Sequence, residues 1–219
     1  MEQLILGIDD AGRGPVIGPM VLAGCLADSS AEKEFKKLGV KDSKQLTQKR
    51  REFLESKIKE LAKTFEIVTL PPVKIDSSND EGIKLNELEA IAIAKIINEI
   101  NKAPYNLNKI KVFVDCPSTS ISKWTDFLKT KIENLSTLEI HCEHKADQNH
   151  VSVSAASILA KCVREKEMQK LKEIYGQEIG SGYTSDSLTI KFLEKHGERH
   201  KDAGIFRKTW ATWKRIYKE

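Results

Sequence analysis

The sequence lacks the features that mark zinc-binding, membrane-spanning and secreted proteins. Four cysteines occur in 219 residues, and no two form a Cys-x-x-Cys pair, which argues against a zinc site. The longest mostly apolar stretch, residues 16–27, is too short to cross a bilayer and is interrupted by glycine and proline. The N-terminus has no basic lead, so we expect a cytoplasmic protein with free thiols.

An excess of charge of one sign is also lacking. The formal net charge is +4, with 31% charged and 40% hydrophobic residues, which is ordinary for a folded globular protein. Any nucleic-acid-binding surface must therefore be a local basic patch. The length predicts one main domain at residues 1–175 and a helical C-terminal segment at residues 176–219 that packs on it.

Apolar periodicity predicts alternating strands and helices. Short apolar or alternating runs predict strands at residues 4–8, 20–27, 64–70, 110–114 and 138–142. Helical spacing predicts helices at residues 47–63 with Thr47 as the cap, 82–101, 151–175, 185–196 with Ser185 as the cap, and 207–217. This order predicts an α/β fold with a mixed central sheet flanked by helices.

Two adjacent carboxylates, Asp9 and Asp10, follow the first predicted strand, and the loop Gly12-Arg13-Gly14 comes shortly after them. Adjacent carboxylates repel each other unless a cation lies between them. Glycines let a backbone come close to a ligand. Acids that bind metal, glycines and an arginine together suggest a substrate that contains phosphate.

Two further aspartates lie where a sheet of this kind places functional groups. Asp115 ends the predicted strand at residues 110–114, and Asp147 precedes the helix that starts near residue 151. If the first and fourth strands are neighbours, Asp9 and Asp115 converge, and Asp147 can join from the helix side. An all-oxygen cluster suits Mg²⁺ or Mn²⁺, and two ions could assist an in-line phosphoryl displacement. The alternative is that each aspartate is a solvated strand end or helix cap.

Five segments, in this order along the chain, resemble a known family. They are DDAGRGPVIGP at 9–19, VKDSK at 40–44, VD at 114–115, KAD at 145–147 and SAASILAK at 154–161. Together they resemble the type 2 ribonucleases H (ribonuclease HII) of the archaeal kind, over nearly the whole chain. The resemblance implies a ribonuclease H-like fold, in which the C-terminal segment helps bind the hybrid.

The resemblance also implies an activity. The family cleaves the RNA strand of RNA–DNA hybrids on the 5′ side of a ribonucleotide, including single ribonucleotides embedded in duplex DNA. The reaction needs a divalent metal and leaves a 3′-hydroxyl and a 5′-phosphate. The family's catalytic, metal-binding acids correspond to Asp9, Asp10, Asp115 and Asp147.

One of these positions departs from the family pattern. The family's second acid is normally glutamate, whereas this chain has Asp10, whose carboxylate is one methylene closer to the backbone. The second metal site is therefore either adjusted or weaker in this chain.

The resemblance further implies contacts with the substrate. It places the glycine loop against the ribose 2′-hydroxyl and a tyrosine against the neighbouring sugar, and its motifs favour phosphate contacts for two lysines. The residues concerned are Gly12, Arg13, Gly14, Tyr183, Lys44 and Lys161. Without the resemblance, the loop could be a tight turn, the tyrosine a surface aromatic and the lysines ordinary solvated groups.

Other aromatic residues and histidines have weaker functional signals. Trp210 and Trp213 are predicted to dock the last helix on the core, with stacking on nucleic acid as the alternative. His144 and His150 are close enough to Asp147 in sequence to assist it.

Two other functions stay open at this point. One is a DNA resolvase or exonuclease with the same acids, against which the glycine loop argues. The other is a non-catalytic hybrid-binding module in which the shorter Asp10 no longer holds metal. We expect a monomer that acts on RNA–DNA hybrids and on duplex DNA containing ribonucleotides.

Overall fold

The structure is a computed structural model that describes residues 3–41 and 46–218. The chain divides into two compact units. The first unit comprises Met1–Ala11, Leu22–Val68 and Asn86–Cys162, and the second comprises Gly12–Val21, Thr69–Leu85 and Val163–Glu219. Each unit therefore brings together segments that lie far apart in the sequence.

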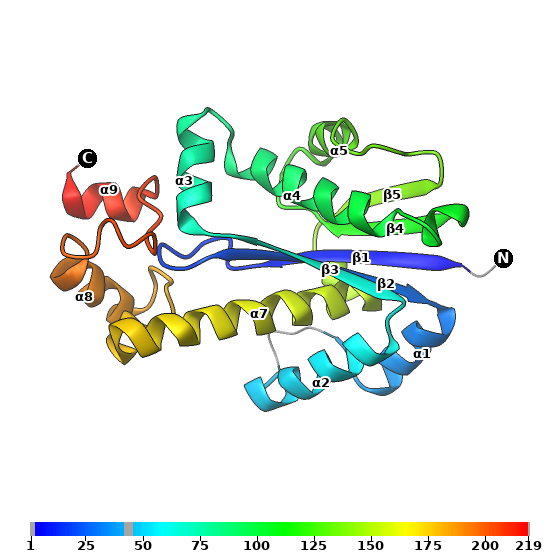
Figure 1. The fold of residues 1–219 in the computed structure, drawn as a ribbon, viewed down its shortest axis with the longest axis horizontal. Coiled ribbons are helices and arrows are strands. Elements are labelled where there is room, and N and C mark those ends of the chain that lie inside the picture. The colour runs from blue at the N-terminus through cyan, green and yellow to red at the C-terminus, as the bar shows by residue number, and fades with distance from the viewer. Residues whose placement is uncertain (1–2, 42–45, 219) are drawn as a thin grey trace. The chain divides into compact units, whose positions relative to one another are not determined.

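Five strands form one mixed sheet in the order β3-β2-β1-β4-β5. They are β1 (Leu4–Ala11), β2 (Met20–Asp28), β3 (Thr64–Leu70), β4 (Ile110–Asp115) and β5 (Leu138–Glu143). The pairs β1–β4 and β4–β5 are parallel, whereas β1 and β2 run in opposite directions (Figure 1). All five predicted strands are confirmed, but β1 continues through Ala11, so Asp9 and Asp10 lie inside the strand and not after it.

Within the described residues, nine α-helices accompany the sheet. They are α1 (Ser29–Lys37), α2 (Gln48–Leu61), α3 (Pro72–Asp80), α4 (Leu85–Ile100), α5 (Ile121–Lys129), α6 (Ala146–Asn149), α7 (Val151–Tyr175), α8 (Ser187–His196) and α9 (Ala211–Tyr217). The predicted helices that correspond to α2, α4 and α7 are confirmed. Thr47 caps α2, because its side chain accepts a hydrogen bond from the Arg50 amide.

Other helix boundaries differ from the predictions. Asp186, not Ser185, caps α8, because its carboxylate accepts a hydrogen bond of 3.0 Å from the Leu188 amide. Helix α9 begins at Ala211 and not at residue 207. The periodicity also does not reveal α1, which starts where the Asp28 carboxylate accepts a hydrogen bond from the Ala31 amide at 2.7 Å.

In the first unit, helices cover both faces of the sheet. Figure 1 shows α4 and α5 on one side and α1, α2 and the start of α7 on the other. Glycines allow the helices to approach the sheet most closely. A Cβ at Gly7 would lie 2.1 Å from the carbonyl carbon of Ser152 in α7, and one at Gly24 would lie 2.4 Å from Ile96 in α4. The small residues at the start of α7 thus meet a strand position without a side chain.

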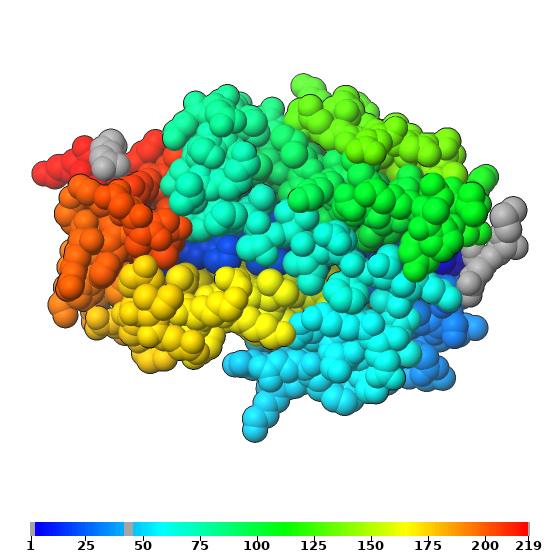
Figure 2. Space-filling view, viewed as in Figure 1, coloured from blue at the N-terminus to red at the C-terminus, as the bar shows by residue number. Residues whose placement is uncertain are grey.

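Helix α2 shows how residues divide between core and surface. Its Leu54 and Ile58 are fully buried, whereas Lys49 and Arg50 are exposed on a helix that lies at the surface (cyan in Figure 2). In the part of the chain that the structure describes, no helix combines the length and the apolar character that crossing a membrane requires.

The second unit has a hydrophobic core of its own. Its buried members are Val16, Ile17, Met168, Ile179, Phe192, Leu193, Ile205, Phe206 and Trp213. Trp213 packs on Phe206 with ring centroids 4.9 Å apart, so the prediction that it docks the last helix is confirmed. Trp210 is partly buried and packs against the same core, so its predicted docking is also confirmed, although it lies just before α9 and not within it.

Candidate functional site

Two neighbouring strands of the first unit bring Asp9 and Asp115 together. Ile8 of β1 pairs with Val114 of β4 in a parallel ladder, and Asp9 and Asp115 are the next residues of the two strands. Side chains at matching positions of neighbouring strands point to the same face of a sheet. The two carboxylates therefore leave the sheet on the same side.

Asp9 is nearly enclosed, with 6% of its surface exposed. Burial raises the pKa of its carboxyl well above the ordinary value, and the charges of Asp10 and Asp115 raise this pKa further. Hydrogen bonds from Ser157 and from the Asp10 amide, the latter 2.8 Å from Oδ1, act in the opposite direction. Burial and the two neighbouring acids thus disfavour the ionised form of Asp9, which a bound cation would stabilise.

A cavity of about 10 Å³ lies among these acids, which is room for about one water molecule or one metal ion. Four of the residues that line it are carboxylic acids, namely Asp9, Asp10, Glu89 and Asp115, and the others are Leu22, Ile93 and Pro117. The structure therefore brings three of the four predicted acids to one place and adds a fourth acid.

Glu89 is the acid that the sequence interpretation missed. It lies on α4 with 1% of its surface exposed. Burial raises the pKa of the Cys116 thiol, and the charges of Asp115 and Glu89 raise it further. Glu89 lines the same cavity as Asp115, which places it close to the end of β4. The signal that could have found Glu89 is its spacing, because it lies four residues before Ile93 on a face of an apolar helix.

Asp9 and Asp10 lie on opposite faces of β1, because successive side chains of a strand alternate. Asp9 shares its face with Gly7, on which α7 packs. Asp10 shares its face with Leu6, which lies with Ile96 of α4 around the Gly24 position. Asp10 and α4 therefore form one wall of the cavity, and Asp9 belongs to the side of α7.

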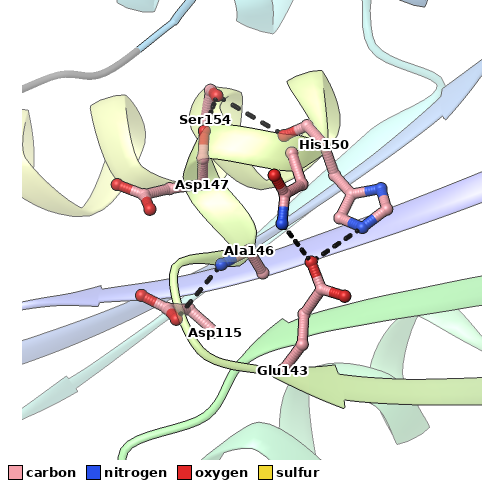
Figure 3. A network of polar contacts seen from close by, with 7 residues as sticks. Asp115, Glu143, Ala146, Asp147, His150 and Ser154 are labelled. Atoms are coloured by element: carbon pink, nitrogen blue, oxygen red, sulfur yellow. Dashed lines mark hydrogen bonds and ion pairs between the residues drawn. The ribbon is translucent and has the colours of Figure 1, made fainter.

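Asp147 lies on the short helix α6, just before α7. Lys145 adopts a left-handed conformation, with φ of 59°, at the turn that enters this helix. The Ala146 amide donates a hydrogen bond of 3.3 Å to Oδ1 of Asp115, and the Ser154 hydroxyl donates one to the Asp147 carbonyl oxygen. In Figure 3 the carboxylates of Asp115 and Asp147 extend to the same side of α6.

Asp147 lines a second and larger cavity rather than the small one. This cavity has a volume of about 470 Å³. Its lining residues are Lys36, Val40, Lys41, Asp147, Gln148, Asn149, Val151 and Ser154. Two lysines thus stand beside a buried aspartate, an arrangement that suits an anionic ligand near a cation site.

The acids fit a divalent cation in chemistry, although they are not yet closed around one. In residues 3–41 and 46–218, no three His, Cys, Asp or Glu side chains are already grouped as a metal site. The donor set is nevertheless all oxygen, one carboxylate is nearly buried, and the small cavity has room for an ion, which is what Mg²⁺ or Mn²⁺ needs.

The two histidines near Asp147 brace the turn that carries it. His150 Nε2 lies 3.1 Å from Oε1 of Glu143 (Figure 3). His144 Nδ1 lies 3.0 Å from the carbonyl oxygen of Cys116. These contacts tie the segment after β5 to the ends of β4 and β5, so the histidines support the turn, and their assistance to Asp147 stays a prediction.

The predicted substrate-reading residues of the second unit are neighbours there. We call residues 12–14 the Gly-Arg-Gly loop. A Cβ at Gly14 would lie 3.9 Å from Cε1 of Tyr183, an ordinary contact distance. Gly12 has φ of +83°, a conformation that other residues rarely adopt. The Val16 amide donates a hydrogen bond of 2.9 Å to the carbonyl oxygen of Gly182, which precedes the exposed Tyr183.

The remaining predicted contacts have separate locations. Arg13 is partly exposed between its two glycines. Lys161 is partly buried on α7 in the first unit. Lys44 lies outside the described residues.

Known proteins share both sequence and fold with this chain. The family model Ribonuclease HII matches residues 6–213. Ribonuclease HII from Methanococcus maripaludis strain C7 is 44% identical over 218 residues, which cover 99% of this chain and 88% of that protein. Ribonuclease H2 from Pyrococcus horikoshii OT3 is similar in structure, with a TM-score of 0.86 and 35% identity over 99% of this chain and 98% of that one.

A more distant structure extends the likeness in fold. Bst-RNase HIII in complex with Mn²⁺ has a TM-score of 0.80 at 23% identity, over 99% of this chain and 70% of that one. The mixed sheet with flanking helices is thus the ribonuclease H-like fold that the sequence motifs imply. Since the family model and the relatives span nearly the whole length, the chain belongs to the ribonuclease HII family and is a ribonuclease H endonuclease.

Proposed function

We propose that the enzyme cleaves the RNA strand of RNA–DNA hybrids on the 5′ side of a ribonucleotide, including a single ribonucleotide embedded in duplex DNA. The products would be a 3′-hydroxyl and a 5′-phosphate. One observation carries this proposal, namely the cavity that Asp9, Asp10 and Asp115 share around buried negative charge.

We place divalent ions, Mg²⁺ or Mn²⁺, at Asp9, Asp10, Asp115 and Asp147. The Mn²⁺ complex of Bst-RNase HIII supports this choice of metal. Bound ions would activate water and stabilise the charge on the departing 3′-oxygen. Asp10 is shorter than the family's usual glutamate, and Glu89 supplies a further carboxylate to the cavity that Asp10 lines.

The chain's own groups keep two of these acids oriented. Ser157 and the Asp10 amide hold the Asp9 carboxylate, and the Ala146 amide holds Asp115. These donors belong to helices and strands, so the carboxylates are oriented before the substrate binds. Such positioning contributes to the rate because the carboxylates do not have to be ordered when the transition state forms.

Lysines near Asp147 suit the sugar-phosphate backbone. Lys36 and Lys41 line the same cavity as Asp147. We propose that phosphates of the hybrid lie against these two lysines, and that Lys44 and Lys161 extend the contact.

Recognition of the ribonucleotide would come from the second unit. A 2′-hydroxyl both donates and accepts hydrogen bonds, and the Gly-Arg-Gly loop offers backbone amides that can donate to it. Tyr183, beside Gly14, would pack against the neighbouring sugar. Residues 176–219 would add to the surface that holds the duplex.

A cleavage assay on duplex DNA with one ribonucleotide tests the proposal. We expect a single cut on the 5′ side of the ribonucleotide with Mg²⁺ or Mn²⁺ and none with EDTA, while an all-DNA duplex of the same sequence stays intact. Equal cutting of both duplexes would overturn the substrate assignment. Tight hybrid binding that is indifferent to metal and yields no product would point to a binding module instead.

We further propose a cytoplasmic monomer. Cys25, Cys116, Cys142 and Cys162 are present as thiols and not as disulfides, which agrees with a reducing compartment. Sedimentation of the purified protein, with and without hybrid, tests the monomer.

A further inference from the structure

We infer that two buried arginines of the second unit, Arg207 and Arg164, position the Gly-Arg-Gly loop and Tyr183 for reading the ribonucleotide. The inference rests on the proposed function and deepens it. Both arginines act through the residues that they hold, and neither needs to contact the substrate.

Arg207 is fully buried and holds the loop through its carbonyl groups. Its Nη2 donates to the Gly12 carbonyl oxygen at 2.6 Å, and its Nη1 donates to the Arg13 carbonyl oxygen at 2.8 Å. Its Nε and Nη2 both donate to the Gly18 carbonyl oxygen, at 3.1 and 3.0 Å. One guanidinium thus fixes both ends of the turn that follows β1.

Trp210 also holds the Gly-Arg-Gly loop in place. The Arg207 guanidinium carbon lies 5.0 Å from the centroid of the Trp210 ring, and the Trp210 Nε1 donates to the Gly14 carbonyl oxygen at 3.1 Å. The three successive carbonyls of the loop are therefore all engaged by these two side chains. In a planar trans peptide the N–H points opposite to the carbonyl. The amides of Arg13 and Gly14 are consequently turned away from the oxygens that Arg207 holds.

Arg164 joins the loop to Tyr183. A Cβ at Gly12 would lie 2.2 Å from the Arg164 Nε, so this side chain fills the space that glycine leaves. Its Nη2 donates to the Ser181 carbonyl oxygen at 3.1 Å, and its guanidinium carbon lies 5.0 Å from the centroid of the Tyr183 ring. The tyrosine ring therefore rests on a group that also packs against the loop.

The hydrogen bonding of Arg164 suggests a supporting role. Arg164 is 8% exposed, and within the described residues its Nε has no hydrogen-bond partner. Buried donors are normally paired, because an unpaired one is unfavourable. The Arg164 side chain thus packs against both the loop and Tyr183, although its buried Nε is left without a hydrogen-bond partner among the described residues.

Replacement by lysine separates charge from geometry. A lysine keeps the positive charge but cannot present several donors in a rigid plane. We expect Arg207→Lys and Arg164→Lys to reduce the affinity for duplex DNA with one ribonucleotide by about 10–100-fold, since a small misplacement has effects of that order. Affinity for all-DNA duplex should change by less than about threefold, because backbone charge governs it.

The experiment measures binding without metal, by fluorescence anisotropy, for the two duplexes and for one with a 2′-fluoro sugar. Arg199→Lys, an exposed arginine of the same unit, is the matched control and should keep the wild-type preference. Trp210→Phe removes the hydrogen bond to Gly14 and keeps an aromatic ring, so it tests the support of the loop if Arg207→Lys does not fold. Thermal unfolding of each variant shows whether it is folded.

The possible outcomes are distinct. Loss of the ribose preference in folded variants supports the inference. An equal loss of affinity for every duplex, or an unchanged preference in Arg164→Lys and Trp210→Phe, overturns it. If the wild-type protein neither prefers nor cuts the ribonucleotide duplex, the proposed function itself fails, and this result is separate from the behaviour of the variants.

Discussion

The Ala146 amide donates a hydrogen bond to Oδ1 of Asp115, which ties the acid at the end of β4 to the helix that carries Asp147. A backbone group of α6 thus orients a side chain of the sheet. Two of the proposed metal-binding acids are coupled in this way before any ion binds.

Asp115→Asn should abolish cleavage without unfolding the protein. Asparagine keeps the oxygen that accepts the Ala146 hydrogen bond and loses only the negative charge. We expect a loss of cleavage of about 10²–10³-fold or more, while hybrid binding persists because a charge that repels phosphate has been removed. Cleavage and anisotropy assays check both points. Asp126→Asn, an exposed acid on α5, is the control and should behave as wild type. Near-normal turnover by Asp115→Asn would count against the mechanism.

Asp9→Asn should stabilise the metal-free protein at neutral pH. The raised pKa of Asp9 means that the folded state binds this proton more tightly than the unfolded chain. The free energy of unfolding must therefore fall as pH rises from the ordinary aspartate pKa through the raised one. In Asp9→Asn the free energy of unfolding should not fall with pH in this way. Each kcal/mol of unfolding free energy that the variant gains over wild type raises Tm by about 2–4 °C for a chain of this size.

Mg²⁺ should make the wild-type protein more stable than Asp9→Asn, the reverse of the order without metal. Mg²⁺ binds the folded wild-type protein and raises its Tm, whereas Asp9→Asn should gain little. Calorimetry in EDTA and in Mg²⁺ between pH 4 and 8 makes the comparison. A variant that is less stable than wild type in EDTA at pH 7 would contradict the role of buried charge.

Asp10→Glu should strengthen metal binding, and Glu89→Gln should weaken it. Asp10→Glu restores the reach of the family's usual acid, and Glu89 lines the same cavity as Asp10. We expect a change of about tenfold in Mn²⁺ affinity for each, measured by calorimetric titration. Glu99→Gln, on the exposed side of the same helix, is the control. Identical Mn²⁺ affinities for Glu89→Gln and wild type would remove Glu89 from the site.

Gly12→Ala and Gly14→Ala should differ in stability. Alanine at position 12 must adopt φ near +83° and meet Arg164 at 2.2 Å, so we expect a loss of about 1–3 kcal/mol. At position 14 the nearest atom would be 3.9 Å away, and stability should change by less than about 0.5 kcal/mol. Urea unfolding of the two variants tests the difference, and equal losses would show that the loop is not held as described.

Lys36→Gln with Lys41→Gln should weaken hybrid binding for every sequence alike. Each lost phosphate contact should reduce the slope of log affinity against log salt by about one. Lys129→Gln, exposed on α5, should leave the slope unchanged. An unaltered slope in the double variant would remove the larger cavity from the binding surface.

Much of the first unit could be predicted because local patterns determine it. The apolar run that becomes β1 and the run that ends on Asp115 are visible as strands, and the parallel pairing of the two brings the acids together. Glu89 was not predictable in the same way. Its role depends on which face of α4 turns toward β1, and the sequence around it reads as an ordinary buried helix.

The support of the Gly-Arg-Gly loop could not be predicted, because its partners are remote in sequence. Arg207 and Gly12 are separated by 195 positions, and no periodic pattern links a single arginine to a distant carbonyl. The helix α9 was misjudged for a related reason. Trp210 lies just before the helix, and its ring nitrogen makes a tertiary hydrogen bond to Gly14 that no local pattern reveals.

Strand β1 has partner strands on both sides, β2 and β4, and carries Asp9 and Asp10. Amides in such an inner strand exchange their hydrogens with solvent only when the whole structure opens, whereas outer strands and loops open locally. On heating, Asp9 and Asp10 should consequently keep their places until the cooperative transition itself, so activity lost at lower temperature would come from the loops and turns that carry the other residues of the site.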